Sequence, residues 1–312
     1  MGERIVKKFH SLLCKDFERL AIMYIYLNGQ FVKKEEALIS PFDHGFLYGI
    51  GLFETFRIYE GHPFLLDDHL ERLNQGLREL AIEINFNKEE TNLILQQLLE
   101  INQLKNAYIR FNVSAGIGEV GLQTEPYFQP NVIIFPKSLP QAGELVEKRA
   151  VLLNLKRNSP EGKERLKSHH FMNNLLAKKE IGNAVDQEGI FLSPEGYVAE
   201  GIVSNIFWKK SNSLYTPSTG TGILNGITRQ FILELAKTMN LDIHEGFFRP
   251  EQVQEADEVF VTNSIQEIVP LFEVWGHRKP GKEGLFIQTL HQYYRELSSC
   301  LWTRHELAGK LS

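Results

Sequence analysis

The feature that most constrains the fold is the alternation of strand-like and helix-like stretches on both sides of a short segment, residues 136–143. This segment contains two prolines and a glycine, which interrupt regular structure, so we expect a linker there. Before it, residues 52–59 have the pattern of a strand, and residues 67–80 place leucines on one helical face. A chain of 312 residues is long enough for two cores. The pattern predicts an α/β (α+β) protein of two domains.

The periodicity assigns elements along the chain. In the first part we expect strands at 24–27, 30–32, 52–59, 108–114 and 131–135, and helices at 67–80 and 88–103. In the second part we expect strands at 148–155, 190–193 and 203–208, and helices at 168–182, 228–239 and 285–299. The expected organisation is an N-terminal extension (1–22), a smaller α+β domain (23–135), the linker (136–143) and a larger domain with a C-terminal helix (144–312).

Composition and charge exclude several classes of partner. The net charge is −5, which gives no reason to expect nucleic acid or an anionic membrane as a partner. No apolar run approaches the roughly 18 residues of a membrane span, and the first 20 residues lack the apolar core of a signal peptide. The two cysteines, Cys14 and Cys300, have no metal-ligand spacing around them, so we expect no metal and a reducing cytoplasm, with a disulfide between the two as the alternative.

The first residue with a chemical signal is Lys167, which stands just before a predicted helix with Ser168 available as its cap. A lysine that forms a Schiff base must be partly desolvated, so that a useful fraction is neutral and nucleophilic. Taken alone, the segment is better explained by a solvated lysine, since lysines are usually exposed.

The second signal is Glu200, which follows a glycine-containing turn and precedes the apolar run 202–207. A carboxylate that faces a pyridine nitrogen keeps this nitrogen protonated and strengthens the ring as an electron sink. A glutamate in a surface turn is the alternative.

The third signal is a glycine-rich loop, residues 220–226, that opens onto a predicted helix at about Thr228. Backbone N–H groups at a helix N-terminus bind phosphate, and the Thr228 hydroxyl can add a hydrogen bond. The loop matches neither the Walker spacing nor the dinucleotide pattern, so nucleotide binding is the least favoured interpretation.

Together these three signals resemble the class IV aminotransferase family, the fold type IV enzymes that use pyridoxal 5′-phosphate (PLP). The chain fits the family signature without a gap over four segments: Glu200, Asn205-Ile206-Phe207, Leu214-x-Thr216 and Leu224-x-Gly226-Ile227-Thr228-Arg229. The resemblance covers nearly all of residues 23–275. It implies the two-domain fold type IV architecture, with PLP bound by the larger domain.

The resemblance also implies a role for each matching residue. Lys167 resembles the Schiff-base lysine and proton shuttle, and Glu200 resembles the partner of the pyridine nitrogen. Arg72, within His69-Leu70-Glu71-Arg72-Leu73, resembles the phosphate-binding arginine, with a helix-surface arginine as the alternative. The other predicted cofactor contacts are Asn205, Ile227, Thr228 and Ser264.

The family includes branched-chain aminotransferases, D-amino acid aminotransferases and 4-amino-4-deoxychorismate lyases. Three segments resemble the lyases: Met172, where branched-chain aminotransferases have tyrosine, the run 262–270, and the run 43–57. This resemblance implies conversion of 4-amino-4-deoxychorismate to 4-aminobenzoate and pyruvate in folate biosynthesis. Amino transfer on branched-chain or D-amino acids is the alternative.

The substrate contacts follow less directly from the sequence. That substrate has two carboxylates, and Arg110 and Arg57 are candidate partners for them by residue type, although both lie in predicted strands. His44 and His170 depart from the common family pattern. With His169 they are acid–base candidates, because histidine titrates near neutrality, but we expect structural or solvated histidines.

The expected partners are a small-molecule substrate and, by resemblance, a second copy of the chain in a homodimer with the active site near the interface. The segment 286–312 has apolar residues at helical spacing and packs either on the core or on a partner chain. A rival from another class is a catalytically idle PLP-binding protein, against which the intact Lys167 and Glu200 argue.

Overall fold

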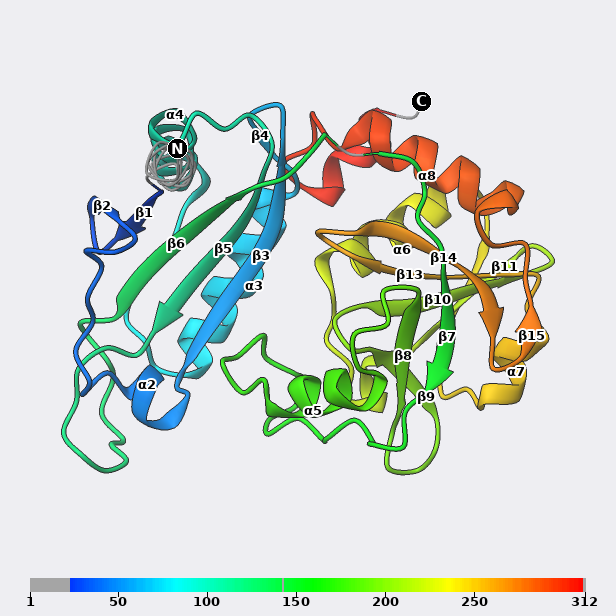
Figure 1. Ribbon diagram of the computed structural model, residues 1–312, viewed down its shortest axis with the longest axis horizontal. Coiled ribbons are helices and arrows are strands. Elements are labelled where there is room, and N and C mark those ends of the chain that lie inside the picture. The colour runs from blue at the N-terminus through cyan, green and yellow to red at the C-terminus, as the bar shows by residue number, and fades with distance from the viewer. Residues whose placement is uncertain (1–22, 142, 311–312) are drawn as a thin grey trace, which may run out of the picture.

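The computed structural model describes residues 23–141 and 143–310, which we call the first and second halves, and each half contains one large β-sheet (Figure 1). The expected extension 1–22 lies outside the described residues. No helix within the described ranges is both long and apolar enough to cross a bilayer.

The first half is a six-stranded antiparallel sheet with the strand order β2-β1-β6-β5-β3-β4. Its strands are β1 (Tyr24–Leu27), β2 (Gln30–Lys33), β3 (Gly51–Tyr59), β4 (His62–Pro63), β5 (Ala107–Ser114) and β6 (Asn131–Ser138). Its helices are α2 (His44–Tyr48), α3 (Leu66–Glu79) and α4 (Lys88–Ile101). The leucines of α3 and α4 share one buried core with the inward side chains of the sheet, and β3 is the long strand that lies nearest the second half (Figure 1).

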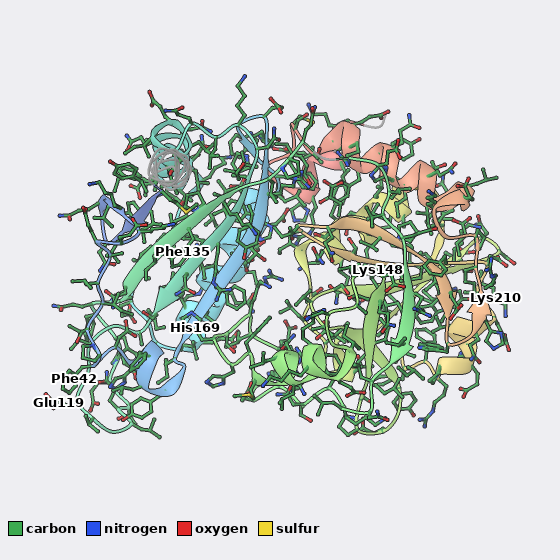
Figure 2. The ribbon with its side chains drawn as sticks, viewed as in Figure 1. Phe42, Glu119, Phe135, Lys148, His169 and Lys210 are labelled. Atoms are coloured by element: carbon green, nitrogen blue, oxygen red, sulfur yellow. The ribbon has the colours of Figure 1, made fainter. Side chains whose placement is uncertain are left out.

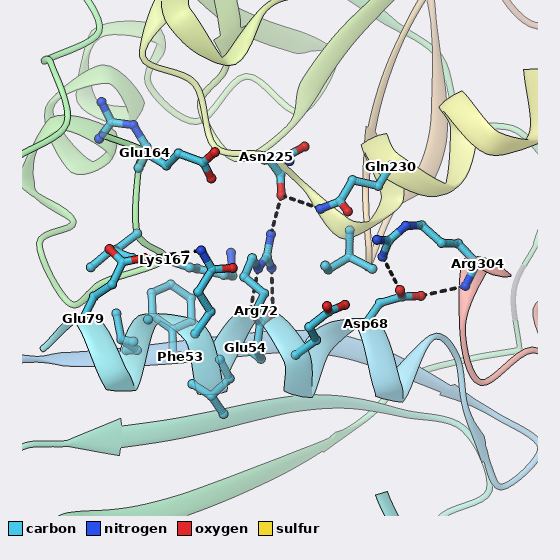
Figure 3. Close-up of a pocket in the computed structure, with 18 residues that line it drawn as sticks. Phe53, Glu54, Asp68, Arg72, Glu79, Glu164, Lys167, Asn225, Gln230 and Arg304 are labelled. Carbon is cyan, nitrogen blue, oxygen red and sulfur yellow. Dashed lines mark hydrogen bonds and ion pairs between the residues drawn. The ribbon is translucent and has the colours of Figure 1, made fainter. Parts of the chain in front are cut away.

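Helix α3 has the sequence signals of a stable helix. Asp67 and Asp68 lie in its first turn, where carboxylates complement the helix dipole. Leu70, Leu73 and Leu77 are buried at helical spacing. The burial of this stripe directs the remaining face of α3, which carries Arg72, away from the core of the first half and toward the second half (Figure 3).

The second half contains a nine-stranded mixed sheet with the order β12-β11-β10-β13-β14-β7-β8-β9, and β15 pairs with β14. Its strands are β7 (Lys148–Leu152), β8 (Gln187–Leu192), β9 (Val198–Gly201), β10 (Asn205–Lys210), β11 (Ser213–Pro217), β12 (Asp242–Gly246), β13 (Glu258–Asn263), β14 (Glu267–Val274) and β15 (His277–Arg278). Its α-helices are α5 (Met172–Ile181), α6 (Ile227–Thr238), α7 (Pro250–Gln254) and α8 (Leu285–Leu297). Helices α6 and α8 bury Phe231 and Tyr294 against the sheet.

The α/β architecture expected from the sequence is confirmed, with differences at element ends. Strand β6 continues through Pro136 to Ser138, because β1 pairs only with residues 133 and 134 and leaves this end of β6 as an edge that tolerates proline. Helix α5 begins at Met172 rather than at 168, so Ser168 is not its cap. Strand β7 ends at Leu152 rather than at 155.

The end of the chain returns to the first half as a C-terminal strap, residues 301–309 (Figure 1). The amides of Leu65 and Asp67 donate to the carbonyls of Leu301 and Trp302 at 3.1 and 3.0 Å. The carboxylate of Asp68 accepts from the Arg304 backbone at 2.7 Å and pairs with its guanidinium. The strap therefore ties the helix that precedes it, α8, to the N-terminus of α3. Of the two expected locations for the C-terminal segment, the strap occupies the core of its own chain.

Candidate functional site

A cavity of about 830 Å³ lies where the two halves meet. The first half contributes side chains from β3, β5 and α3, including Phe53, Arg72 and Arg110. The second half contributes residues from separate segments, including Lys167, Glu200, Asn205, Ile227, Thr228 and Ser264. Every cofactor residue expected from the sequence therefore lines one cavity. A smaller cavity of about 160 Å³ lies between α3 and the start of α6 and shares Lys167 and Arg72 with the large one (Figure 3).

Lys167 is positioned by an extended segment that pairs with β3. The amide of Phe53 donates to the Lys167 carbonyl at 3.0 Å, and the amide of His169 donates to the Gly51 carbonyl at 3.0 Å. A bridge between Leu52 and Ser168 lies between these two bonds. The lysine thus belongs to a strand-like segment beside β3 rather than to the first turn of a helix.

The Lys167 amine is set up to lose its proton easily. Its Nζ lies 4.7 Å from the centroid of the Phe53 ring and forms no ion pair with a carboxylate in the described part of the chain. Burial, followed by the positive charge of Arg72, lowers the pKa of Lys167 to about 8. A substantial fraction of the amine is therefore neutral near physiological pH, as nucleophilic lysines require.

Arg72 reaches across from α3 toward the second half (Figure 3). Its Nε and Nη2 donate to the two carboxylate oxygens of Glu54, both at 2.7 Å, and its Nη1 donates to the Asn225 carbonyl at 2.9 Å. Burial alone would raise the pKa of Glu54, but the Arg72 charge and the hydrogen bond from His69 outweigh it and hold that pKa at about 2. The Glu54 carboxylate is therefore ionised near neutral pH.

Glu200 lies on β9 and is buried. Its Oε1 accepts from Arg157 Nε at 2.8 Å, and its Oε2 accepts from the Leu224 amide at 3.1 Å and from Asn205 Nδ2 at 3.3 Å. Burial raises the pKa of Glu200, and the adjacent Arg157 charge opposes the rise. Asn205 also donates to the Leu224 carbonyl at 2.9 Å, so it ties the glutamate to the glycine-rich loop.

The opposite end of the site is the N-terminus of α6. The helix begins at Ile227. Its N-cap residue is Gly226, so no cap side chain accepts from the first N–H groups of the helix. Its first N–H groups have no partner within the helix and form an anion-binding end. Ser264, in the turn between β13 and β14, places its Oγ 3.1 Å from Thr228 Oγ1. Two hydroxyls from distant segments thus converge beside the helix end.

The two candidate substrate arginines have different environments. Arg110 lines the cavity, with its guanidinium carbon 3.8 Å from the centroid of the Phe53 ring. Arg57 is absent from the cavity lining and is buried in a joint between the halves. It donates to Glu267 Oε1 at 3.3 Å and to the Pro140 carbonyl at 2.6 Å. Since Glu267 also pairs with Arg295 at 2.7 Å, Arg57 completes a structural network.

The three histidines also differ. His44 is buried between Tyr127 Oη at 2.9 Å and the Glu119 carbonyl at 2.8 Å, which makes it a structural residue. Burial, followed by the positive charge of Arg110, lowers the pKa of His169 to about 4. His170 is exposed at the cavity rim.

Sequence reasoning missed Glu54 and Arg157, which hold Arg72 and Glu200. Arg157 also donates to Asn173 Oδ1 at 2.7 Å, on the first turn of α5. Neither residue has a local sequence signal, because each partner lies at least 18 residues away. The only available hint was that a buried carboxylate requires a cation.

The set of groups around the cavity fits one kind of ligand. An activated amine, a carboxylate backed by an arginine, and a helix N-terminus with two hydroxyls and a second arginine are suited to an aldehyde, a ring nitrogen and a phosphate respectively. Gly226 is also required for this cradle, since a Cβ there would lie 2.2 Å from Asn205 Oδ1. The residues present therefore fit PLP.

Comparison with known proteins gives a consistent result. The sequence model of the amino-transferase class IV family matches residues 51–274. The chain is 45% identical over 289 residues to the aminodeoxychorismate lyase of Bacillus subtilis (strain 168), covering 92% of this chain and 98% of that protein. It is 36% identical to a putative branched-chain-amino-acid aminotransferase of Methanocaldococcus jannaschii, covering 88% and 96% respectively.

Solved structures agree with these relatives. The branched-chain aminotransferase of Thermoproteus uzoniensis with norvaline matches with a TM-score of 0.80 and 27% identity, covering 89% of this chain and 96% of that one. A T.th. branched-chain amino acid aminotransferase complexed with N-(5′-phosphopyridoxyl)-L-glutamate matches with a TM-score of 0.80 and 27% identity, covering 90% and 95%.

Proposed function

The chain belongs to the class IV aminotransferase family, and from this premise we propose that it is a PLP-dependent lyase that converts 4-amino-4-deoxychorismate to 4-aminobenzoate and pyruvate, a step in folate biosynthesis. The observation that carries the proposal is that Lys167 and Glu200, from separate segments, line one cavity together with the anion-binding end of α6. The similarity to the Bacillus subtilis lyase over nearly the whole chain supports the choice of reaction.

We assign the cofactor contacts as follows. Lys167 would hold PLP through its amine, Glu200 would face the ring nitrogen, and Asn205 orients Glu200. The phosphate would be held by Arg72, the first N–H groups of α6, Thr228 and Ser264. When bound, PLP supplies an electron sink beside the carbon that carries the substrate amino group.

In the proposed reaction, the amine of Lys167 moves one proton. Once the substrate amino group has displaced Lys167, the freed neutral Nζ takes the proton from C4 of the substrate, and a pKa of about 8 suits this base near neutral pH. The enolpyruvyl C–O bond at C3 breaks, and the ring becomes aromatic, which provides the driving force. The proton held on Nζ is then available to the departing enolpyruvate, which becomes pyruvate. Arg110 is the proposed partner of a substrate carboxylate, because it is a cation on the cavity wall without a carboxylate partner among the described residues.

The alternative function is amino transfer, since other relatives and the matched structures are aminotransferases. The deciding experiment incubates the PLP-loaded protein with aminodeoxychorismate and measures pyruvate with a coupled lactate dehydrogenase assay. A parallel reaction measures amino transfer from leucine or D-alanine to 2-oxoglutarate. We expect rapid pyruvate release that Lys167→Ala abolishes. Transfer to 2-oxoglutarate without pyruvate release would replace this function with the alternative.

We also propose that the protein works as a homodimer in the cytoplasm. Support for the dimer is an apolar surface on α2 and the neighbouring loop, formed by Phe42, Phe46, Ile117 and Val120. The two segments lie side by side, since Gly118 donates to the Phe42 carbonyl and Asp43 bridges Ile117, and Figure 2 shows Phe42 beside Glu119. Large exposed apolar patches mark interaction sites. Support for the cytoplasm is the scarcity of cysteine, with Cys300 unpaired within the described ranges.

A further inference from the structure

The carboxylate of Glu54 is placed behind Arg72 rather than in the large cavity. Glu54 lies on β3 and is 1% exposed. Both of its oxygens accept from the Arg72 guanidinium, through Nε and Nη2. Such a two-point pair fixes the plane of a guanidinium as well as its position, which a single hydrogen bond would not do.

A third bond completes the orientation of Arg72. Its Nη1 donates to the carbonyl of Asn225, the residue that precedes the cap of α6 (Figure 3). A guanidinium has five N–H donors. Glu54 and Asn225 accept from three of these donors. One N–H therefore remains on Nη1 and one on Nη2, and both are available to a ligand beside the N-terminus of α6.

Glu54 is itself fixed by His69, one helical turn before Arg72 on α3. Its Oε2 lies 2.7 Å from His69 Nδ1. Because an ionised carboxylate can only accept, His69 donates this hydrogen bond from Nδ1, and burial lowers the pKa of the histidine. His69 is bonded to Glu54, and Glu54 is bonded to Arg72, so the three side chains form one connected hydrogen-bond network.

We propose that Glu54 is a positioning residue that acts through Arg72 to select and hold the phosphate of the cofactor, an inference that rests on the proposed PLP function. Arginine side chains are flexible, and a guanidinium that is already held in one orientation loses less conformational entropy when it binds phosphate. The Glu54 carboxylate also repels a phosphate dianion. Because the Arg72 charge stands between the two, we expect the gain from orientation to exceed this repulsion.

The test compares two ligands that differ only in the phosphate. The dissociation constants of PLP and of unphosphorylated pyridoxal are measured by absorbance titration for the wild type and for Glu54→Gln, which keeps the size of the side chain. We expect the constant for PLP to rise about tenfold, because the glutamine keeps only one acceptor oxygen and no charge and so cannot form the two-point pair with Arg72, and that for pyridoxal to change less than about twofold. Glu100→Gln is the matched control, because Glu100 is an exposed carboxylate on α4 that lines neither cavity, and both constants should be unchanged.

A double-mutant cycle distinguishes a positioning role from general damage. In an Arg72→Gln background, Glu54→Gln should cause no further change in the ratio of the two constants. The phosphorus NMR shift of bound PLP is a second readout, and in Glu54→Gln it should move toward that of free PLP. If Glu54→Gln does not fold, as judged by circular dichroism, His69→Gln removes one bond to Glu54 and should change the ratio about threefold in the same direction.

The outcomes separate the two proposals. Equal weakening of PLP and pyridoxal, tighter PLP binding, or an additive effect in the Arg72→Gln background would overturn the role of Glu54 while the proposed function stands. A wild-type protein that binds neither ligand would overturn the proposed function and the role of Glu54 with it.

Discussion

Lys167 has an amine that titrates within the range in which an enzyme of this kind works. With a pKa of about 8, about a tenth of the amine is neutral at pH 7, compared with a far smaller fraction for an ordinary lysine. Because only the neutral amine attacks an aldehyde, we expect the second-order rate of PLP capture to rise about tenfold for each pH unit below 8 and to level off above about 9. Stopped-flow absorbance of the apoprotein mixed with PLP measures this rate.

The same property affects the stability of the apoprotein. The folded lysine has a lower pKa than the unfolded one, so the unfolded chain binds more protons between pH 8 and 10.5. The contribution of this group to the free energy of unfolding therefore rises with pH across that window and is least favourable below pH 8. Lys167→Met should remove this part of the pH dependence.

For the capture experiment, a rate of PLP capture that stays flat from pH 6 to 9 would show that burial does not depress the pKa of Lys167 as described.

Among the site residues, the sequence predicted those that lie in a recognisable sequence motif. The spacing from Glu200 to Thr228 is carried by one continuous stretch, and the structure brings Arg72 and Ser264 to the same cavity. It could not distinguish Arg110 from Arg57, because both are arginines in strands. Arg57 is held by Glu267, whose place across the joint between the halves follows only from tertiary packing.

Among the elements, the start of α6 depends most strongly on a single residue. Gly226 has ordinary helical-cap dihedrals, with φ −62°, so an alanine would cause no backbone strain there. Its Cβ would however lie 2.2 Å from Asn205 Oδ1 and displace the residue that orients Glu200. We expect Gly226→Ala to weaken PLP binding by about tenfold or more while the melting temperature changes by only a few degrees, as measured by absorbance titration and calorimetry.

Gly61→Ala is a control for the glycine change itself, since a Cβ at Gly61 meets no neighbour, although its positive φ makes the alanine mildly strained. It should leave PLP affinity unchanged. Unchanged affinity in Gly226→Ala would mean that Asn205 can shift without cost to the site.

Element ends were less predictable than element types. The lysine segment was expected to lead straight into a helix, but residues 167–169 pair with β3 instead. The pairing partner lies more than 100 residues earlier, which a local pattern cannot reveal. Proline at 136 suggested a linker, but the edge position of that part of β6 accommodates it.

For the whole molecule, the apolar surface of Phe42, Phe46, Ile117 and Val120 predicts association. Phe46 is 71% exposed and Val120 is 73% exposed. If this surface joins two copies, Phe46→Glu should shift the sedimentation coefficient from that of a dimer to that of a monomer at micromolar concentration, because it buries a charge in an apolar contact. Leu285→Glu is the matched control, since Leu285 is 78% exposed on α8, and it should leave the dimer intact. A wild type that sediments as a monomer would reject the dimer.

The C-terminal strap has a consequence for how the protein is made. Residues 301–309 cover the start of α3, which was synthesised more than 200 residues earlier. The N-terminal part of a nascent chain can form its sheet and helices on the ribosome, but Leu65 and Asp68 stay uncovered until residues 301–309 have themselves been made and have left the ribosome. The emergence of this strap, rather than of either half, therefore sets the moment at which α3 acquires its final contacts.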